Sequence, residues 1–460
     1  MTDALFNEEL IQRYDVAGPR YTSYPTAVQF TEAYGPAEYR AQALATNATG
    51  APLSLYVHIP FCDTVCYYCA CNKVVTKDRG RAAPYLERLH KELALQGELF
   101  DGQRPVDQMH WGGGTPTFLS HGEMEELVAT IDRHFALRHD DSGEYGIEID
   151  PREVAPGTLA LLRRLGFNRL SIGVQDLDAR VQQAVNRVQP EAVTFGAIDE
   201  ARREGFHSVS IDLMYGLPHQ SRASFAETLD RVAAARPDRI AVFNYAHLPH
   251  MFGPQRRIDE ADLPSPAEKL AILRDTIERL TAAGYVYIGM DHFALPEDEL
   301  ARAQRAGTLH RNFQGYSTHA DCDLIAVGVT GVGQVGQSYS QNVREVEPYF
   351  ERIDAGELPI FRGIELSFDD RLRRAVITDL ICHFRLDRRA TGERWGVDFD
   401  DYFADELAAL APMAADGLVA FEGDVLRVCE PGKLLIRNIC MTFDAYLEQA
   451  GEKPRFSRVI

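Results

Sequence analysis

Three cysteines, Cys62, Cys66 and Cys69, follow the pattern C-x-x-x-C-x-x-C directly after the apolar run 53–60. Three thiolates can hold three corners of a cubane [4Fe–4S] cluster, whereas such clusters are normally held by four cysteines. The fourth iron is then left without a protein ligand, so it can bind a small molecule through amino and carboxylate groups. The spacing therefore predicts an iron–sulfur centre with one open coordination site.

Two other kinds of site fit the same residues. A structural zinc site needs four nitrogen or sulfur ligands in closed tetrahedral geometry, and Cys71 or His58 could supply the fourth. Cys66 and Cys69 also have the C-x-x-C spacing of thiol–disulfide redox motifs. The two tyrosines between these cysteines, and the glycine-rich segment 112–114, favour the cluster over both alternatives.

The composition is that of an ordinary globular protein, long enough for one large domain and one smaller domain. Of the 460 residues, 45% are hydrophobic and 25% are charged. The N-terminus lacks the basic and apolar regions of a signal peptide, and no apolar run reaches the ~18 residues that a membrane helix needs. The eight cysteines do not form a disulfide framework, because half of them are crowded into 62–71. We therefore expect a cytoplasmic protein without a membrane span.

The net charge argues against one class of partner. The formal charge of −20 is unfavourable for nucleic-acid binding, which depends on neutralising phosphates with Lys and Arg. The charge identifies no partner by itself, because acidity mainly affects solubility.

Strand-like apolar runs alternate with amphipathic segments between residues 54 and 290. We expect strands at 54–59, 108–111, 146–149, 169–172, 208–213, 239–245 and 287–290. We expect helices at 83–98, 121–134, 156–165, 190–203, 222–235 and 265–283. This alternation predicts a parallel sheet built from βαβ units. In barrels of this kind the chemistry lies at the carboxyl ends of the strands.

Glycine or polar residues follow six of these strands, at 112–115, 148–150, 175–176, 212, 245–246 and 291–292. Any one of them could be a turn or a helix cap, but six together predict an active-site rim. Glu148, Gln175 and Asp212 carry acceptor oxygens that suit ribose hydroxyls or an ammonium group.

The strand–helix alternation stops near residue 365. We expect helices at 369–384, 400–410 and 432–447 and a small hairpin formed by 417–421 and 425–428, which together suggest a winged-helix-like domain. Winged helices often bind DNA, but an acidic tail without a basic recognition helix favours a cap on the barrel. The predicted domains are an N-terminal arm or lid (1–50), a barrel (51–310), a connecting segment that contributes to the site (311–364) and the helical domain (365–460).

Several long and unusual strings resemble the radical S-adenosylmethionine (AdoMet) superfamily and, within it, the oxygen-independent coproporphyrinogen III oxidase family. They begin with the strand before the cysteines, the cysteine run itself and Trp111-Gly-Gly-Gly-Thr-Pro-Thr117. Others occur at 148–152, 173–176, 211–218, 243–249, 289–293, 310–316 and 456–460. The resemblance extends from about residue 10 to the C-terminus.

This resemblance implies a partial (β/α)6-type barrel, one [4Fe–4S] cluster and two AdoMet molecules. Cys62, Cys66 and Cys69 would bind the cluster. One AdoMet pocket would be lined by Tyr56, Gly113 and Glu148, and the other by Tyr68, Gly114, Thr115, Gln175, Arg187, Asp212, Ala246 and Val332. The family usually has Phe at position 68 and Ile at position 332, and both replacements keep a ring or a branched apolar group.

The implied reaction converts the ring A and B propionates of coproporphyrinogen III to vinyl groups. It needs a radical, because the propionate β-hydrogen is not acidic enough for a general base. Cys71 is a candidate proton or hydrogen-atom donor, and Arg20, Arg311 and Gln314 are candidate propionate contacts. We also expect a flavodoxin-like or ferredoxin-like electron donor and a monomeric protein. The alternative within the superfamily is a haem-binding chaperone without oxidase turnover.

Overall fold

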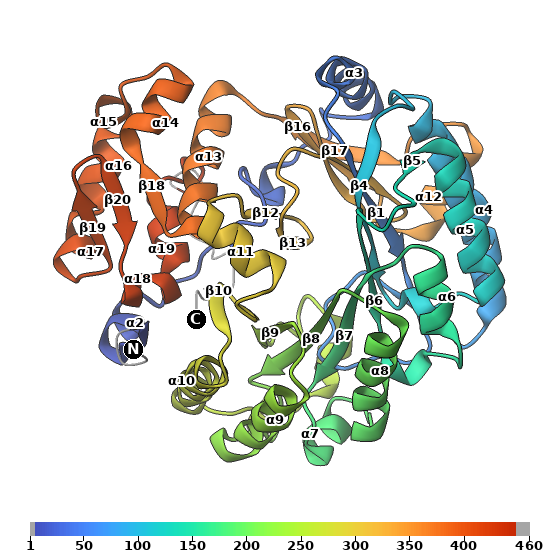
Figure 1. The fold of residues 1–460 in the computed structure, drawn as a ribbon, viewed down its shortest axis with the longest axis horizontal. Helices are drawn as coiled ribbons and strands as arrows, with labels where there is room; N and C mark the ends of the chain where they lie inside the picture. The colour runs from blue at the N-terminus through green and yellow to red at the C-terminus, as the bar shows by residue number, and fades with distance from the viewer. Residues whose placement is uncertain (1–4, 448–460) are drawn as a thin grey trace. The chain divides into compact units, whose positions relative to one another are not determined.

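The computed structural model describes residues 5–447, which form two compact units, each assembled from separate stretches of the chain (Figure 1). The sheet unit consists of Phe30–Asp275 and Asp321–Glu365. The helical unit consists of the described parts of Met1–Gln29, Thr276–Ala320 and Leu366–Ile460. The predicted domain boundaries at 50, 310 and 364 stay a prediction, and the motif 456–460 lies outside the described residues.

The sheet unit is built on parallel strands in the order β9-β8-β7-β6-β4-β1-β14. They are β1 (Leu53–Ile59), β4 (Pro105–Gly113), β6 (Glu144–Ile149), β7 (Arg169–Gln175), β8 (Ser208–Tyr215), β9 (Arg239–Asn244) and β14 (Asp323–Val327). Three antiparallel strands continue the sheet beyond β14, namely β15 (Val332–Val335), β16 (Ser338–Asn342) and β17 (Ile360–Glu365). The strand order does not return to β9, so this set of strands forms an open barrel wall.

Helices follow the parallel strands and cover the outer face of the curved sheet (Figure 1). They are α4 (Ala82–Gly97), α5 (His121–His134), α6 (Thr158–Arg164), α8 (Glu191–Glu204) and α9 (Arg222–Ala235), and α10 (Pro266–Ala282) spans the division between the units. In α5, Ser120 and Glu123 form a capping box, and Leu127 and Ile131 are buried one helical turn apart. Each predicted helix of this region is present, with ends that differ by a few residues at most.

The predicted strand 287–290 exists as β10 (Val286–Gly289), but it is not a parallel strand. It pairs antiparallel with β11 (His292–Ala294) and belongs to the helical unit. Only Met290 and Asp291 connect the two strands, and Met290 has a φ of 54°, so the chain turns back at once. A parallel crossover needs a dozen or more residues, which this connection does not have.

A buried carboxylate joins four elements of the sheet unit. Glu92 on α4 is fully buried and accepts hydrogen bonds from Gly328 N at 2.7 Å, Asn342 Nδ2 at 2.9 Å and the Tyr349 hydroxyl at 2.7 Å. Its donors come from the turn after β14, from β16 and from α12 (Val346–Asp354). Burial raises the pKa of Glu92 to about 7, although the three donors act in the opposite direction.

The helical unit combines helices with a small three-stranded sheet. Its larger helices are α13 (Phe368–His383) and α14 (Arg388–Trp395), and the sheet has the order β18-β20-β19, from Arg385–Asp387, Val425–Val428 and Val419–Glu422. The N-terminal α2 (Glu8–Tyr14) packs here, because Arg13 Nη1 and the Tyr14 hydroxyl both lie 2.7 Å from the carboxylate of Asp416.

Two predicted helices of this unit are interrupted. The segment 400–410 divides into α15 (Phe399–Tyr402) and α16 (Ala404–Ala409), and 432–447 contains α18 (Glu430–Leu434) and α19 (Ile436–Met441). The residues at the breaks, Phe403 and Leu435, have non-helical backbone angles and are fully buried. Packing of these two side chains into the core overrides the local helix propensity. Among the described residues, no helix is long and apolar enough to cross a membrane.

Candidate active site

The cysteine loop begins where β1 ends. The short strand β2 (Phe61–Cys62) pairs in parallel with β3 (Val74–Val75), and the intervening loop carries the other cysteines. Cys66 is buried, Cys62 and Cys69 are half-buried, Cys71 is exposed, and all four are free thiols. The loop is fixed to the chain before α8, because Tyr67 N donates to Val185 O at 3.0 Å.

The sulfur atoms have different neighbours. Cys66 Sγ lies 3.6 Å from Arg187 Nη1 and 3.8 Å from Arg152 Nη2. Cys62 Sγ accepts from the Thr115 hydroxyl at 3.5 Å. The side-chain hydrogen bond of Cys71 lowers the pKa of Cys69 to about 5, despite burial. Burial instead raises the pKa of Cys62 to about 12, although the Thr115 hydroxyl acts in the opposite direction, so the surroundings favour the thiolate form at Cys69 but not at Cys62.

His58 is not free to serve as the fourth ligand of a zinc site. Both ring nitrogens of His58 are engaged, Nδ1 by the Tyr56 hydroxyl at 3.1 Å and Nε2 by Asn72 O at 3.2 Å. In the described part of the chain, no three or more His, Cys, Asp or Glu side chains are grouped so that they could hold a metal ion.

The glycines at the end of β4 lie directly against the start of the cysteine loop. Gly114 N donates to Ile59 O at 2.8 Å, and a Cβ at Gly114 would lie 2.6 Å from Phe61 O. Gly113 has a φ of 114°, and a Cβ there would lie 2.6 Å from the ring of His58. Only glycine fits these two positions, so the strand end can present its backbone groups at close range.

Two carboxylates lie near one another, Glu148 near the end of β6 and Asp212 in the middle of β8. Burial opposes ionisation of Glu148, but His110 Nε2 at 3.3 Å and Gly113 N at 3.2 Å stabilise its charge, so its pKa is lowered. Burial and the charge of Glu148 raise the pKa of Asp212 to about 7, while the Ser171 hydroxyl donates to it at 3.0 Å. Both carboxylates keep acceptor capacity for further donors.

Arg187 has a buried guanidinium group, and one of its N–H donors is not used within the described residues. Its Nη1 donates to Asp150 Oδ2 at 2.9 Å, and its Nη2 donates to Gly173 O at 2.6 Å. Its Nε–H has no partner among the described residues. Gln175 lies beside it at the end of β7, since a Cβ at Gly173 would lie 3.0 Å from Arg187 Nη2 and 3.2 Å from Gln175 Nε2. An unpartnered buried donor of this kind suits an anionic ligand.

Three further predicted residues are less closely connected. Gln255 Nε2 donates to Tyr68 O at 3.0 Å and to Ala246 O at 3.3 Å, which brings these two together. Val332 begins β15, two strands from β1 along the sheet.

The predicted substrate contacts all lie in the helical unit. Arg20 forms an ion pair with Asp291. Arg311 is only 8% exposed and lies over the Tyr316 ring, 4.7 Å from its centroid, yet its Nε and Nη1 have no partner among the described residues. Gln314 Nε2 also has no hydrogen-bond partner among them.

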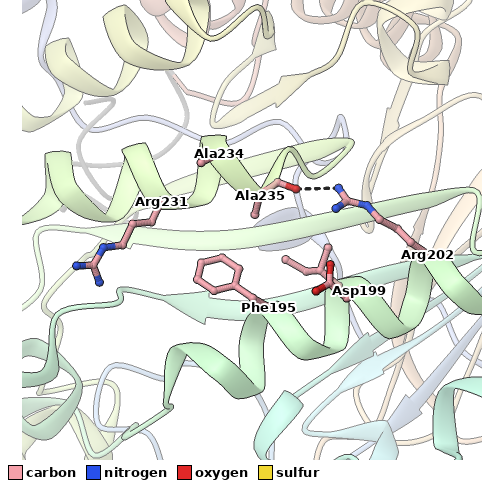
Figure 2. Close-up of a pocket in the computed structure, with 7 residues that line it drawn as sticks. Phe195, Asp199, Arg202, Arg231, Ala234 and Ala235 are labelled. Carbon is pink, nitrogen blue, oxygen red and sulfur yellow. Dashed lines mark hydrogen bonds between the residues drawn. The ribbon is translucent and has the colours of Figure 1, made fainter.

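A separate hollow of about 370 Å³ lies between α8 and α9 (Figure 2). It is lined by Phe195, Ile198, Asp199, Arg202, Arg231, Ala234 and Ala235. Arg202 Nη2 donates across it to Ala235 O at 2.8 Å. None of the predicted site residues lines this hollow, so it lies apart from the cysteine loop.

Comparison with known proteins identifies the family. The Radical SAM superfamily matches residues 56–232, and the HemN C-terminal domain matches residues 366–435. A protein from Pseudomonas aeruginosa named oxygen-independent coproporphyrinogen III oxidase is 54% identical over 455 residues, which cover 99% of each chain. The protein of the same name from Escherichia coli is 51% identical over 98% of each chain. The chain belongs to the oxygen-independent coproporphyrinogen III oxidase family.

A solved structure of a family member supports the fold. Coproporphyrinogen III oxidase (HemN) from Escherichia coli, described as a radical SAM enzyme, matches with a TM-score of 0.92 and 49% identity, over 96% of this chain and 100% of that chain. This match confirms the predicted α/β fold with a helical C-terminal domain. Membership of the radical SAM superfamily implies a [4Fe–4S] cluster and AdoMet as cofactors.

Sequence reasoning did not select several residues that the oxidase fold places at this site. Asp150 and Arg152 stand beside Cys66, His110 holds Glu148, and Lys73 Nζ donates to Cys69 O at 3.1 Å. Asp150 and Arg152 do occur in the strand-end motif 148–152, so their position after β6 was a usable signal. His110 lies in β4 near two other polar residues, Asp107 and Gln108, and nothing in the sequence distinguishes it from them.

Proposed function

We propose that this chain is an oxygen-independent coproporphyrinogen III oxidase that converts the ring A and B propionates to vinyl groups. The reaction releases two CO2 and gives protoporphyrinogen IX in anaerobic haem biosynthesis. The observation that carries the proposal is the 54% identity with the Pseudomonas aeruginosa oxidase over 99% of both chains. Identity of this extent covers the cysteine loop, the strand ends and the helical unit together.

Cys62, Cys66 and Cys69 would bind the cluster. When bound, the cluster and AdoMet supply a carbon radical that can take the unactivated propionate β-hydrogen. The cysteine loop and the glycines of β4 would hold these groups at the carboxyl end of the sheet and limit the access of water. Cys71, which is exposed beside Cys69, would remain free to donate a proton or a hydrogen atom.

Two AdoMet molecules are part of the proposal, with their residues divided by the family pattern. Tyr56, Gly113 and Glu148 would serve one molecule, and the hydrogen bonds around Glu148 support a fixed acceptor there. The other would be held by Tyr68, Gly114, Thr115, Gln175, Arg187, Asp212, Ala246 and Val332. The unpartnered Nε–H of Arg187 supports a contact with the carboxylate of a methionine moiety.

The substrate carries four propionates and needs buried cations. Arg311 and Gln314 are the stronger candidates, because both carry unpartnered donors and Arg311 is almost completely buried. Arg20 is already paired with Asp291, so a propionate would have to compete with that carboxylate. A flavodoxin-like or ferredoxin-like electron donor, a monomeric state, a cytoplasmic location and the four-part domain division complete the proposal.

The test is an anaerobic incubation of reconstituted protein with coproporphyrinogen III, AdoMet and a strong reductant. The expected result is 5′-deoxyadenosine together with a vinyl-bearing product, measured by chromatography and mass spectrometry. Omission of AdoMet should abolish both signals and serves as the control. Stable haem binding with no product would contradict the proposal and favour the haem chaperone.

A further inference from the structure

Two of the three predicted cluster ligands have cationic neighbours, and Cys66 has more of them. Cys66 Sγ has two guanidinium neighbours, Arg187 Nη1 at 3.6 Å and Arg152 Nη2 at 3.8 Å. Cys69 has the single ammonium group of Lys73, and Cys62 accepts from the neutral hydroxyl of Thr115 at 3.5 Å. Arg187 already has a proposed role toward AdoMet, whereas Arg152 has none.

Arg152 is held rigidly by a single carboxylate. Its Nε lies 2.9 Å from Asp150 Oδ1, its Nη2 lies 2.5 Å from Asp150 Oδ2, and its backbone N–H donates to Asp150 Oδ1 at 3.0 Å. The Arg152 side chain is 18% exposed and that of Asp150 is 8% exposed. Asp150 also accepts from Arg187, so one aspartate orients both guanidinium groups toward the same sulfur.

We propose that Arg152 is a positioning residue that raises the reduction potential of the cluster through its hydrogen bond and charge at Cys66. The inference rests on the proposed function, because it requires a cluster on the three cysteines. Reduction adds one negative charge to the cluster and its thiolates. A fixed cation and an N–H donor at the sulfur therefore stabilise the reduced form more than the oxidised form. The two arginines and Asp150 leave a net charge of one positive unit beside Cys66.

The matched experiment compares Arg152→Gln with Arg163→Gln. Arg163 is also held by an aspartate, with Nη1 and Nη2 at 3.2 Å and 3.0 Å from the Asp141 oxygens, and its side chain is 19% exposed. It lies on α6 and has no contact with a cysteine in the structure. Glutamine at position 152 can still donate to Asp150, so this variant removes the charge while keeping a partner for the carboxylate. Arg152→Lys keeps the charge but loses the planar fork.

The measurement is an anaerobic redox titration of reconstituted protein, followed by electron paramagnetic resonance, with iron and sulfide determined on the same samples. At a fixed potential, Arg152→Gln should lower the ratio of reduced to oxidised cluster about tenfold, which is 59 mV for a one-electron couple. Arg152→Lys should fall between Arg152→Gln and the wild type. Arg163→Gln should match the wild type.

Wild-type potentials in both Arg152 variants, at full cluster content, would overturn the inference. An equal shift in Arg163→Gln would also overturn it, because the effect would then be a general result of losing an arginine. If Arg152→Gln takes up no cluster, the reduction potential of Arg152→Lys decides the matter: a potential below that of the wild type supports the inference, and a wild-type potential overturns it. If neither variant takes up a cluster but both melt like the wild type, Arg152 serves cluster assembly and the inference is wrong. Absence of a cluster in the wild type would instead refute the proposed function.

Discussion

Glu92 offers a test of the energetics of the sheet unit that does not involve the cofactors. Replacing Glu92 with Gln removes an ionisable group from a fully buried position and keeps its shape. The Tyr349 hydroxyl can rotate to accept from the new amide, but the amide nitrogen cannot accept, so either Gly328 N–H or Asn342 Nδ2–H loses its acceptor. This loss lowers stability by an amount that does not depend on pH, so the test compares the slopes of stability against pH.

The sign and size of this pH dependence follow from the pKa of Glu92, which burial raises from 4.5 to about 7. Between these values the folded protein holds a proton that the unfolded chain has released, so stability falls as pH rises. The contribution of the neutral carboxyl is fully present below about pH 4.5 and is lost as pH rises through about 7. At about 1.4 kcal/mol per pH unit, the loss is on the order of 3 kcal/mol. Glu92→Gln should lack this loss.

The assay is urea unfolding between about pH 5 and pH 8, followed by tryptophan fluorescence. The chain has two tryptophans, and Trp111 is fully buried in the sheet unit. A Trp395→Phe background therefore makes the signal specific to that unit. Tyr349→Phe is the matched control, because loss of its hydrogen bond should raise the pKa of Glu92 further and increase the loss of stability. Parallel curves for Glu92→Gln and the parent over this pH range would refute the reasoning.

Three further predictions test the site. Cys66→Ser should abolish bound iron and sulfide, whereas Cys71→Ser should retain both; equal loss in the two variants would contradict the ligand assignment. Gly113→Ala should weaken AdoMet binding measured by calorimetry, because its Cβ would lie only 2.6 Å from the His58 ring. The control Gly157→Ala, also at positive φ but in open space, should bind AdoMet normally. Arg311→Gln should raise the KM for coproporphyrinogen III about 10- to 150-fold with little change in kcat, as expected for loss of a charged hydrogen bond of about 1.5–3 kcal/mol. An unchanged KM would remove Arg311 from the substrate site.

The parallel part of the fold could be predicted because its signals are local. The six strands β1, β4, β6, β7, β8 and β9 are apolar runs that end in glycine or polar residues, and the helices between them have their own amphipathic patterns. The two-residue strands β2, β3 and β5 were not predicted. The parallel strand β14 was not predicted, since its partner β1 is distant in sequence. The antiparallel strands β15, β16 and β17 were not predicted either, because they are short. The pairing of β10 was predicted wrongly because strand character alone does not determine direction.

The candidate site could also be predicted only in part. The cysteine ligands could be proposed from spacing, since the chemistry of three thiolates is specific. The surroundings of Cys66 could not, because Arg152 reaches it across 86 positions of sequence and depends on Asp150 for its orientation. Local sequence carries little information on such contacts. His110 was missed for a related reason, as its importance depends on Glu148 in the neighbouring strand.

The helical unit is assembled from stretches of chain that are far apart in sequence, and this has a consequence for synthesis on the ribosome. Residues near the N-terminus find their partners near the other end of the chain, since Arg437 Nε donates to Pro19 O at 2.8 Å and Arg13 Nη1 contacts Asp416 at 2.7 Å. At about 5–20 residues per second, the nascent arm must wait roughly 20–80 s for these partners to be translated. The first residues to emerge are thus among the last to become ordered, and during that interval they are available to chaperones and proteases.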